Sequence, residues 1–193
     1  MKIGLYFGSF NPIHTGHLII ASHIINATDI EKIWLLVSPH NPLKLSKTLL
    51  NEYHRLHLVR LAIEDDVNLK ASDVEFKLPK PSYTIDTITY LKERFPQHEF
   101  SIIVGSDSFM NLHKWKNFQQ LIAENKIIVY KRPGFEIGDN NVNALVLNNA
   151  PMLEISATHI RNLISKGKSI RYLVSEKVRE EIERSGYYKN NNV

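Results

Sequence analysis

The sequence predicts an α/β protein with a Rossmann-like, doubly wound, mostly parallel sheet and a small C-terminal helical portion. Short strand-like runs alternate with helical patterns along the chain. Runs such as KIGLYF and KIWLLV are almost continuously apolar, which is typical of parallel strands covered on both faces. A length of 193 residues suits one domain with a full layered core. We therefore expect a single domain over residues 1–193, with the helical portion at about 156–187.

The first part of the chain alternates two strands with two helices. Lys2–Phe7 is a buried strand that ends at Gly8, and Gly16–Ala27 carries a broad apolar stripe at helical spacing. Lys32–Val37 is the next strand, and the Pro-bearing stretch after it is a loop. Asn51–Glu64 is helical by its periodicity. Its expected core-facing residues are Tyr53, Leu56, Val59, Ala62 and Ile63, and its more polar residues are Glu52, Arg55 and Arg60.

The middle of the chain repeats this alternation. Val67–Ala71 is a weak strand, and Val74–Ser82 is a connection that contains Pro and Lys. Thr84–Phe95 is a helix stopped by a proline at the following position. Glu99–Val104 is a strand that ends at a glycine, and Trp115–Glu124 has a helical pattern.

The last part of the chain is expected to hold two strands and then two helices. Lys126–Tyr130 and Ala144–Leu147 are the strands. The helices Ala157–Ser165 and Glu176–Ser185 each follow a serine that can cap them. Each is also followed by a glycine, which suits the left-handed conformation that commonly ends a helix.

The composition excludes several classes of protein. The chain has no Cys, which excludes disulfides, a thiolate nucleophile, a Cys-ligated zinc and an iron–sulfur cluster. The first ten residues do not form a secretory signal, and no apolar run reaches the roughly 20 residues of a membrane span. We therefore expect a cytoplasmic protein without a membrane partner. The formal charge of +4 is compatible with nucleic acid or with an anionic small molecule.

The segment from Gly8 to His17, which joins the first strand to the first helix, is the most informative. In an open parallel sheet, ligands bind outside the carboxyl ends of the strands, where this segment lies. Gly8 and Gly16 allow the backbone to approach a ligand, and the helix start offers N–H groups to an anion. His14 and His17 are spaced so that both can face the same ligand. A turn with two surface histidines is the alternative, but this location and the two glycines favour binding. A zinc site is not expected, because no carboxylate is close in sequence.

A second anion cradle is predicted at the start of the helix Ala157–Ser165. Ser156 can cap this helix, Thr158 lies in its first turn, and Arg161 follows one turn later. An ordinary cap with a surface arginine is the alternative. Together, His14-Thr15-Gly16-His17 and Ile155-Ser156-Ala157-Thr158-His159-Ile160-Arg161 resemble the HxGH and ISSTxIR motifs of the nucleotidyltransferase superfamily. Ala157 replaces the second serine of the latter motif.

Three further stretches resemble the nicotinate-nucleotide adenylyltransferases of that superfamily. They are the loop Ser38-Pro39-His40-Asn41-Pro42-Leu43-Lys44, the segment Pro81-Ser82-Tyr83-Thr84-Ile85-Asp86-Thr87, and Gly105-Ser106-Asp107 with the later Trp115. In the first loop, Asn11 stands where this family commonly has Asp. The resemblance runs from Lys2 to about Tyr187, nearly the whole chain.

The resemblance implies adenylyl transfer from ATP to nicotinate mononucleotide, giving deamido-NAD and pyrophosphate in NAD biosynthesis. The implied catalytic residues are His14, His17 and Arg161. The implied ATP-binding residues are Gly8, Ser9, Phe10, His14, Gly16, His17, Gly105, Asp107, Arg132, Ser156, Thr158 and Arg161. The implied mononucleotide-binding residues are Lys44, Ser82, Tyr83, Thr84 and Trp115. Four of these residues also have a simpler structural interpretation. Lys44 is then a solvated lysine, Asp107 a turn cap, Arg132 part of a turn, and Trp115 a core residue.

We expect Mg²⁺ to arrive with ATP rather than in a protein metal site. The alternatives are a related adenylyltransferase that acts on nicotinamide mononucleotide or phosphopantetheine, and a non-catalytic nucleotide- or RNA-binding module. A nucleic-acid partner is not expected, because aromatic residues are not interleaved with the basic ones as a stacking platform requires. The sequence leaves a homo-oligomer open.

Overall fold

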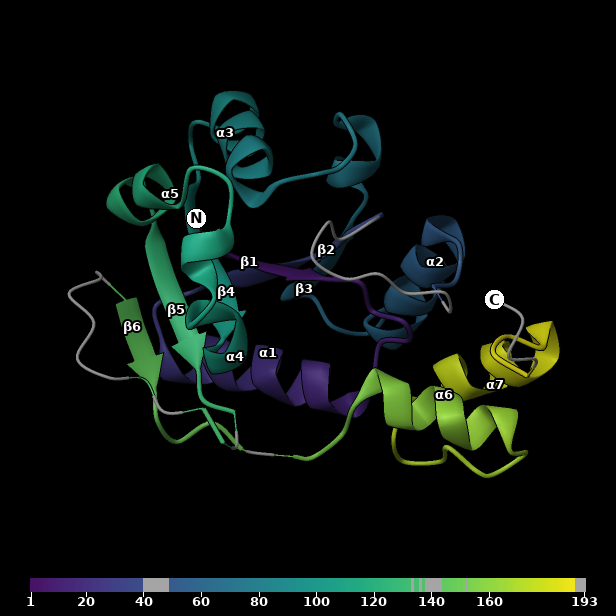
Figure 1. The fold of residues 1–193 in the computed structure, drawn as a ribbon. Helices are drawn as coiled ribbons and strands as arrows, with labels where there is room; N and C mark the ends of the chain where they lie inside the picture. Colours follow the sequence, from purple (N-terminus) through teal and green to yellow (C-terminus); the bar gives the residue numbers. More distant parts are fainter. Residues whose placement is uncertain (40–48, 133, 136, 138–143, 152, 190–193) are drawn as a thin grey trace.

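A computed structural model describes residues 1–39, 49–132, 134–135, 137, 144–151 and 153–189. Its centre is a six-stranded sheet in the order β3-β2-β1-β4-β5-β6, in which every neighbouring pair is parallel (Figure 1). The strands are β1 (Lys2–Gly8), β2 (Lys32–Val37), β3 (Leu69–Ser72), β4 (Glu99–Gly105), β5 (Lys126–Tyr130) and β6 (Ala144–Leu147). This confirms the predicted Rossmann-like α/β fold.

Helices cover both faces of the sheet, which is why its strands are apolar on both sides. One face is covered by α1 (Thr15–Ala27), α2 (Glu52–Ala62), α6 (Ala157–Ser165) and α7 (Glu176–Ser185). The other face is covered by α3 (Thr84–Arg94), α4 (Ser106–Phe109) and α5 (Phe118–Glu124). Alternate residues of each strand enter the two cores: Ile103 joins the first, while Ile102 and Val104 join the second. Two short 3-10 turns, η1 (Val74–Lys77) and η2 (Leu112–Lys114), complete the described elements.

The strand order places a crevice at the middle of the sheet. The chain proceeds outward from β1 to β2 and β3 and then returns to the other side of β1 to form β4. The connections after β1 and β4 therefore diverge to opposite faces, and a crevice opens at the carboxyl ends of these two strands. Gly8 and Gly105 are the last residues of β1 and β4, so both lie at this crevice.

The sequence predictions for α2 and α5 are partly wrong. Arg55 of α2 is fully buried, whereas Tyr53, expected in the core, is 64% exposed. The predicted helix Trp115–Glu124 begins only at Phe118, because Trp115 is extended and Asn117 takes a left-handed conformation with φ of 50°. In that conformation Asn117 interrupts any helical path from Trp115.

The caps of the last two helices differ from each other. Ser156 accepts a hydrogen bond from the backbone N–H of His159 at 3.1 Å, as predicted for the start of α6. Ser175 was expected to cap α7, but its side chain makes no capping bond. Gly186 ends α7 with φ of 68°, in the left-handed conformation that glycine accepts without strain. No helix among the described residues is long and apolar enough to cross a membrane.

Candidate active site

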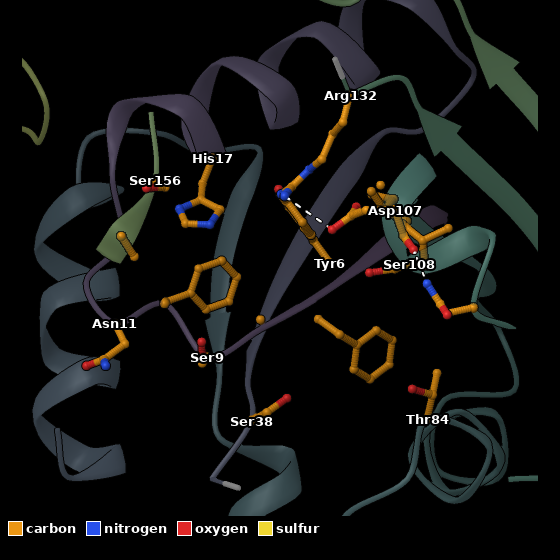
Figure 2. Close-up of a pocket in the computed structure, with 18 of the residues that line it drawn as sticks. Tyr6, Ser9, Asn11, His17, Ser38, Thr84, Asp107, Ser108, Arg132 and Ser156 are labelled. Atoms are coloured by element: carbon orange, nitrogen blue, oxygen red, sulfur yellow. Dashed lines mark hydrogen bonds and ion pairs between the residues drawn. The ribbon is translucent and has the colours of Figure 1, made fainter. Parts of the chain in front are cut away.

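A cleft of about 1370 Å³ opens at the crevice between β1 and β4. Its walls come from the ends of these strands, the turn before α3, the region of α4 and η2, and the start of α6. Figure 2 shows Ser156 beside His17 on one side of this cleft, and Thr84 on the side far from Ser156. The volume exceeds that of a typical small-ligand pocket, so the cleft has room for more than one small ligand.

Phe10 shapes the bottom of the cleft on the β1 side. It adopts a positive φ of 43°, is almost fully buried, and packs edge-on against Tyr6 and His17, with ring centroids 5.9 and 5.0 Å apart. A Cβ atom at Gly8 would lie 2.8 Å from the Phe10 ring, which is too close. A side chain at residue 8 would therefore displace the Phe10 ring from its contact with His17.

His14 and His17 stack on each other, with ring centroids 3.7 Å apart. The backbone N–H of His14 donates to Nδ1 of His17 at 3.2 Å. With Nδ1 acting as an acceptor, the neutral His17 ring carries its proton on Nε2, which makes Nε2 a hydrogen-bond donor. His14 is 7% exposed, and burial, followed by the Arg132 charge, lowers its pKa to about 4. His14 is therefore neutral near pH 7.

Arg161 reaches across the start of α6 to the loop after β1. Its Nη1 donates to the backbone carbonyl of Asn11 at 2.8 Å, and its Nη2 donates to the Thr158 hydroxyl at 3.2 Å. Its guanidinium thus ties α6 to the loop that bears His14. Thr158 and Arg161 both line the cleft, as does Ser156.

Asp107 and Arg132 form the wall on the β4 and β5 side. Arg132 Nη1 lies 3.4 Å from Asp107 Oδ2, and Arg132 Nη2 donates to the Tyr130 hydroxyl at 3.1 Å (Figure 2). A Cβ at Gly105 would lie 2.5 Å from Asp107 Oδ1, so glycine is needed for this arrangement. Among the described atoms, Asp107 Oδ1 is buried and has no hydrogen-bond partner. This oxygen suits a donor group on a ligand.

A buried carboxylate organises the wall formed by the turn before α3. Glu75 is 2% exposed and accepts hydrogen bonds from the hydroxyls of Ser82 and Thr87, each at 3.0 Å, and a further one from Ser38. Burial raises the pKa of Glu75. Ser82 therefore faces Glu75, and Thr84 is the first residue of α3. Ser82, Tyr83 and Thr84 line the cleft, and the first N–H groups of an α-helix have no partner within the helix.

Aromatic side chains stand next to this helix end. Tyr83 and Trp115 are half-buried and line the cleft, and both pack against the core beneath α3. The Lys116 ammonium lies 4.9 Å from the centre of the Tyr83 ring. Trp115 thus packs against the core and also lines the cleft.

Arg55 holds three segments behind the cleft and was missed by sequence reasoning. Its guanidinium donates to the backbone carbonyls of Leu50, Ser9, Ser38 and Pro39, at 2.7, 2.5, 2.8 and 3.0 Å. Ser9 and Ser38 both line the cleft, and these bonds occupy their backbone carbonyls. No pattern in the sequence indicates this role, because an arginine in a helix normally faces water.

The structure brings most of the predicted site residues to one cleft. It is lined by the implied ATP-binding residues Gly8, Ser9, Phe10, His14, His17, Gly105, Asp107, Arg132, Ser156, Thr158 and Arg161, and by Ser82, Tyr83, Thr84 and Trp115. Gly16 does not line it. Gly16 is buried beside the His14 ring, where a Cβ would lie 3.1 Å from Nδ1. Lys44 lies outside the described residues. Sequence reasoning missed Tyr6, Tyr130 and Glu75, none of which belongs to a recognised motif.

Among the described residues, no group of three or more His, Cys, Asp or Glu side chains gathers as a metal site. The cleft instead offers hydrogen-bond donors and cations: imidazoles, hydroxyls, helix ends and two arginines. This set suits negatively charged ligands.

Comparisons with known proteins agree with this geometry. A family profile described as cytidylyltransferase-like matches residues 5–163. The probable nicotinate-nucleotide adenylyltransferase of Flavobacterium psychrophilum is 50% identical over 192 residues, covering 98% of this chain and 100% of that protein. That of Flavobacterium johnsoniae is 48% identical with the same coverage.

A solved structure has the same fold. It is the Plasmodium falciparum nicotinic acid mononucleotide adenylyltransferase complexed with NaAD, which aligns with a TM-score of 0.80 over 98% of both chains. At 21% sequence identity, this likeness is one of fold.

Proposed function

This chain belongs to the cytidylyltransferase-like family and, within it, to the nicotinate-nucleotide adenylyltransferases, and from this premise we propose how its cleft performs the reaction. The activity is adenylyl transfer from ATP to nicotinate mononucleotide, a step of NAD biosynthesis. The residue assignments rest on one observation: His17 and the start of α6 line the same cleft, at the ends of β1 and β4.

The reaction needs positioning more than it needs a base. An oxygen of the mononucleotide phosphate attacks the α-phosphorus of ATP, the bond to the bridging oxygen breaks, and pyrophosphate leaves with that oxygen. The attacking phosphate is already anionic at neutral pH, so no side chain has to remove a proton. The protein must instead hold two mutually repelling anions in line and stabilise the charge that develops during transfer.

The triphosphate lies, in this proposal, between His17 and the amino-terminal end of α6. Nε2 of His17 donates to a phosphate oxygen, and its orientation is fixed by the His14 backbone and the Phe10 ring. Ser156, Thr158 and the first N–H groups of α6 supply further donors. Arg161 adds positive charge from the same helix, while Gly105, Asp107 and Arg132 border the nucleoside.

The mononucleotide lies against the other wall. The amino-terminal end of α3 presents backbone N–H groups next to Tyr83 and Trp115. N–H donors suit the carboxylate of nicotinate, which only accepts hydrogen bonds, and the aromatic rings suit stacking with the pyridine. Lys44 stays a candidate for a phosphate contact from the loop.

We propose Mg²⁺ as the divalent ion and treat it as part of the MgATP substrate. Nucleotidyltransferases generally use a divalent metal with ATP. Such an ion neutralises part of the triphosphate charge and usually keeps several waters. The donor-rich walls described above fit a metal that is held by phosphates.

Pyrophosphate release tests the proposal. We expect release from MgATP only when a pyridine mononucleotide is present, with deamido-NAD formed in equal amount. A panel of nicotinate mononucleotide, nicotinamide mononucleotide and phosphopantetheine separates this enzyme from related transferases. Equal ATP turnover without any acceptor contradicts transfer, and salt-sensitive RNA binding without turnover supports a binding module instead.

A further inference from the structure

The side chain of Asn11 lies behind the cleft although the residue borders it. Asn11 is 4% exposed, and its amide is directed away from the middle of the cleft (Figure 2). Its Oδ1 accepts hydrogen bonds from the backbone N–H of Leu50 at 3.2 Å and from the Tyr188 hydroxyl at 2.9 Å. The Asn11 side chain therefore links the loop after β1 to two distant parts of the chain.

Tyr188 comes from the segment that follows α7, far from the cleft in sequence. It is 5% exposed and packs in the core cluster beneath α1 and α2. Burial raises the pKa of Tyr188 well above its usual range, although Arg55 and Arg161 oppose this with their charges. The hydroxyl thus keeps its proton at ordinary pH and donates a hydrogen bond to Asn11 Oδ1.

The same loop residue is also held by Arg161. While Tyr188 and Leu50 bind the Asn11 side chain, Arg161 Nη1 binds its backbone carbonyl at 2.8 Å. Asn11 is flanked by Phe10, which supports His17, and lies three residues before His14. Fixing Asn11 consequently fixes the residues on both sides of it.

We propose that Tyr188 is a positioning residue for adenylyl transfer, which acts by anchoring Asn11 and, through it, the loop that carries Phe10 and His14. This inference rests on the proposed function of the cleft. Tyr188 does not line the cleft and touches no substrate. It matters because in-line transfer is sensitive to small displacements of the groups that hold the phosphates.

The matched pair Tyr188→Phe and Tyr187→Phe tests the proposal. Both substitutions remove one hydroxyl from neighbouring tyrosines and keep the ring. The Tyr187 hydroxyl pairs with Nδ1 of the exposed His54 at 2.9 Å, so its variant serves as the control. We expect kcat/KM for ATP to fall by about three- to tenfold in Tyr188→Phe, the effect of one lost hydrogen bond, and to be unchanged in Tyr187→Phe.

A binding measurement separates positioning from general stability. ATP should raise the melting temperature less in Tyr188→Phe than in wild type or Tyr187→Phe, since this shift reports affinity for the folded state. Kinetics are measured well below both melting temperatures, so that unfolding does not contribute. Equal losses in the two variants, or none in Tyr188→Phe, overturn the proposal.

Combining Tyr188→Phe with Asn11→Ala tests the route. If Tyr188 acts through Asn11, the double variant is no worse than Asn11→Ala alone. Additive losses overturn the route. Absence of deamido-NAD formation by the wild-type protein is a different result, which contradicts the proposed function and is seen before any variant is made.

Discussion

His14 and His17 differ in chemistry although they belong to one short motif and stack on each other. His17 has its Nδ1 bound by a backbone N–H, so its outward nitrogen is a donor fixed in direction. His14 is buried and neutral, with a Nδ1 that lacks a hydrogen-bond partner among the described residues. His17 is therefore suited to stabilise the charge that develops on the transferred phosphate group, and His14 is suited to orient the His17 ring.

Replacing His17 with Ala should slow the chemical step. A preorganised donor acts most strongly on charge that develops in the transition state, and losing one typically costs on the order of 10²–10³ in kcat. ATP affinity should change much less. Steady-state kinetics check this, with His159→Ala as a control, because His159 is exposed outside the cleft. A raised KM with unchanged kcat would assign His17 to ground-state binding.

His14 should make the stability of the protein depend on pH. The unfolded chain protonates this histidine near its ordinary pKa of 6.5, whereas the folded protein does so only near 4. Between these values the unfolded state binds more protons, so stability falls as pH falls, by at most about 1.4 kcal/mol per pH unit. Denaturant unfolding from pH 7 to 4.5 should show a shallower decline in His14→Gln than in wild type. Parallel curves would contradict a buried neutral His14.

At the scale of elements, the proposed function makes the start of α3 the recognition surface for the mononucleotide, and Glu75 holds this helix start in place. The hydroxyls of Ser82 and Thr87 both donate to this carboxylate, which fixes the turn into the helix. The N–H groups of a helix start should favour a carboxylate over an amide, because the NH₂ group of an amide is a donor that cannot pair with them. The preference for nicotinate over nicotinamide mononucleotide is thus predicted to be a property of the helix end.

Glu75→Gln should weaken that preference. Glutamine keeps one acceptor oxygen but adds an NH₂ group where hydroxyl donors converge, which disturbs the turn. We expect kcat/KM for nicotinate mononucleotide to fall about tenfold, as for one charged hydrogen bond, with KM for ATP unchanged. Both mononucleotides are compared on each preparation, and Glu93→Gln on the exposed side of α3 is the control. A wild-type enzyme with equal kcat/KM for both acceptors would refute this account of recognition.

Most elements were predictable because their signals are local. Apolar runs identify the strands of the sheet, and Ser156 and Gly186 mark where α6 begins and α7 ends. The start of α5 was not predictable, since the left-handed Asn117 leaves no pattern in the sequence.

In α2, the sequence predicts the wrong sides for Arg55 and Tyr53, because the acceptors of Arg55 are carbonyls of loops distant in sequence. The motif residues were found because they gather at strand and helix ends, whereas Glu75 and Tyr188 act through partners that only the fold supplies.

At the scale of the whole molecule, the cleft is built where loops from different parts of the chain meet. The loop after β1, the end of β2 and the approach to α2 converge on the single guanidinium of Arg55. Arg55 is fully buried, and among the described residues it has no carboxylate partner within ion-pair distance. Its charge is solvated by backbone carbonyls, and the bonds to Arg55 fix the orientation of those carbonyls beside the cleft.

Arg55→Lys should therefore affect both stability and activity. An ammonium has three donors on one atom and cannot serve four carbonyls spread around a planar guanidinium, so buried acceptors lose their partners. Each such loss costs about 1–3 kcal/mol, which corresponds to a fall in Tm of roughly 3–10 °C for a chain of this size. Because the Ser9 and Ser38 carbonyls regain freedom to turn toward the phosphates, kcat/KM should fall for both substrates even where the variant is fully folded.

Arg60→Lys, on the exposed side of the same helix, should match wild type in both measurements. A variant that melts early but keeps wild-type kcat/KM would confine Arg55 to stability, and one that changes neither property would contradict the hydrogen bonds on which this argument rests.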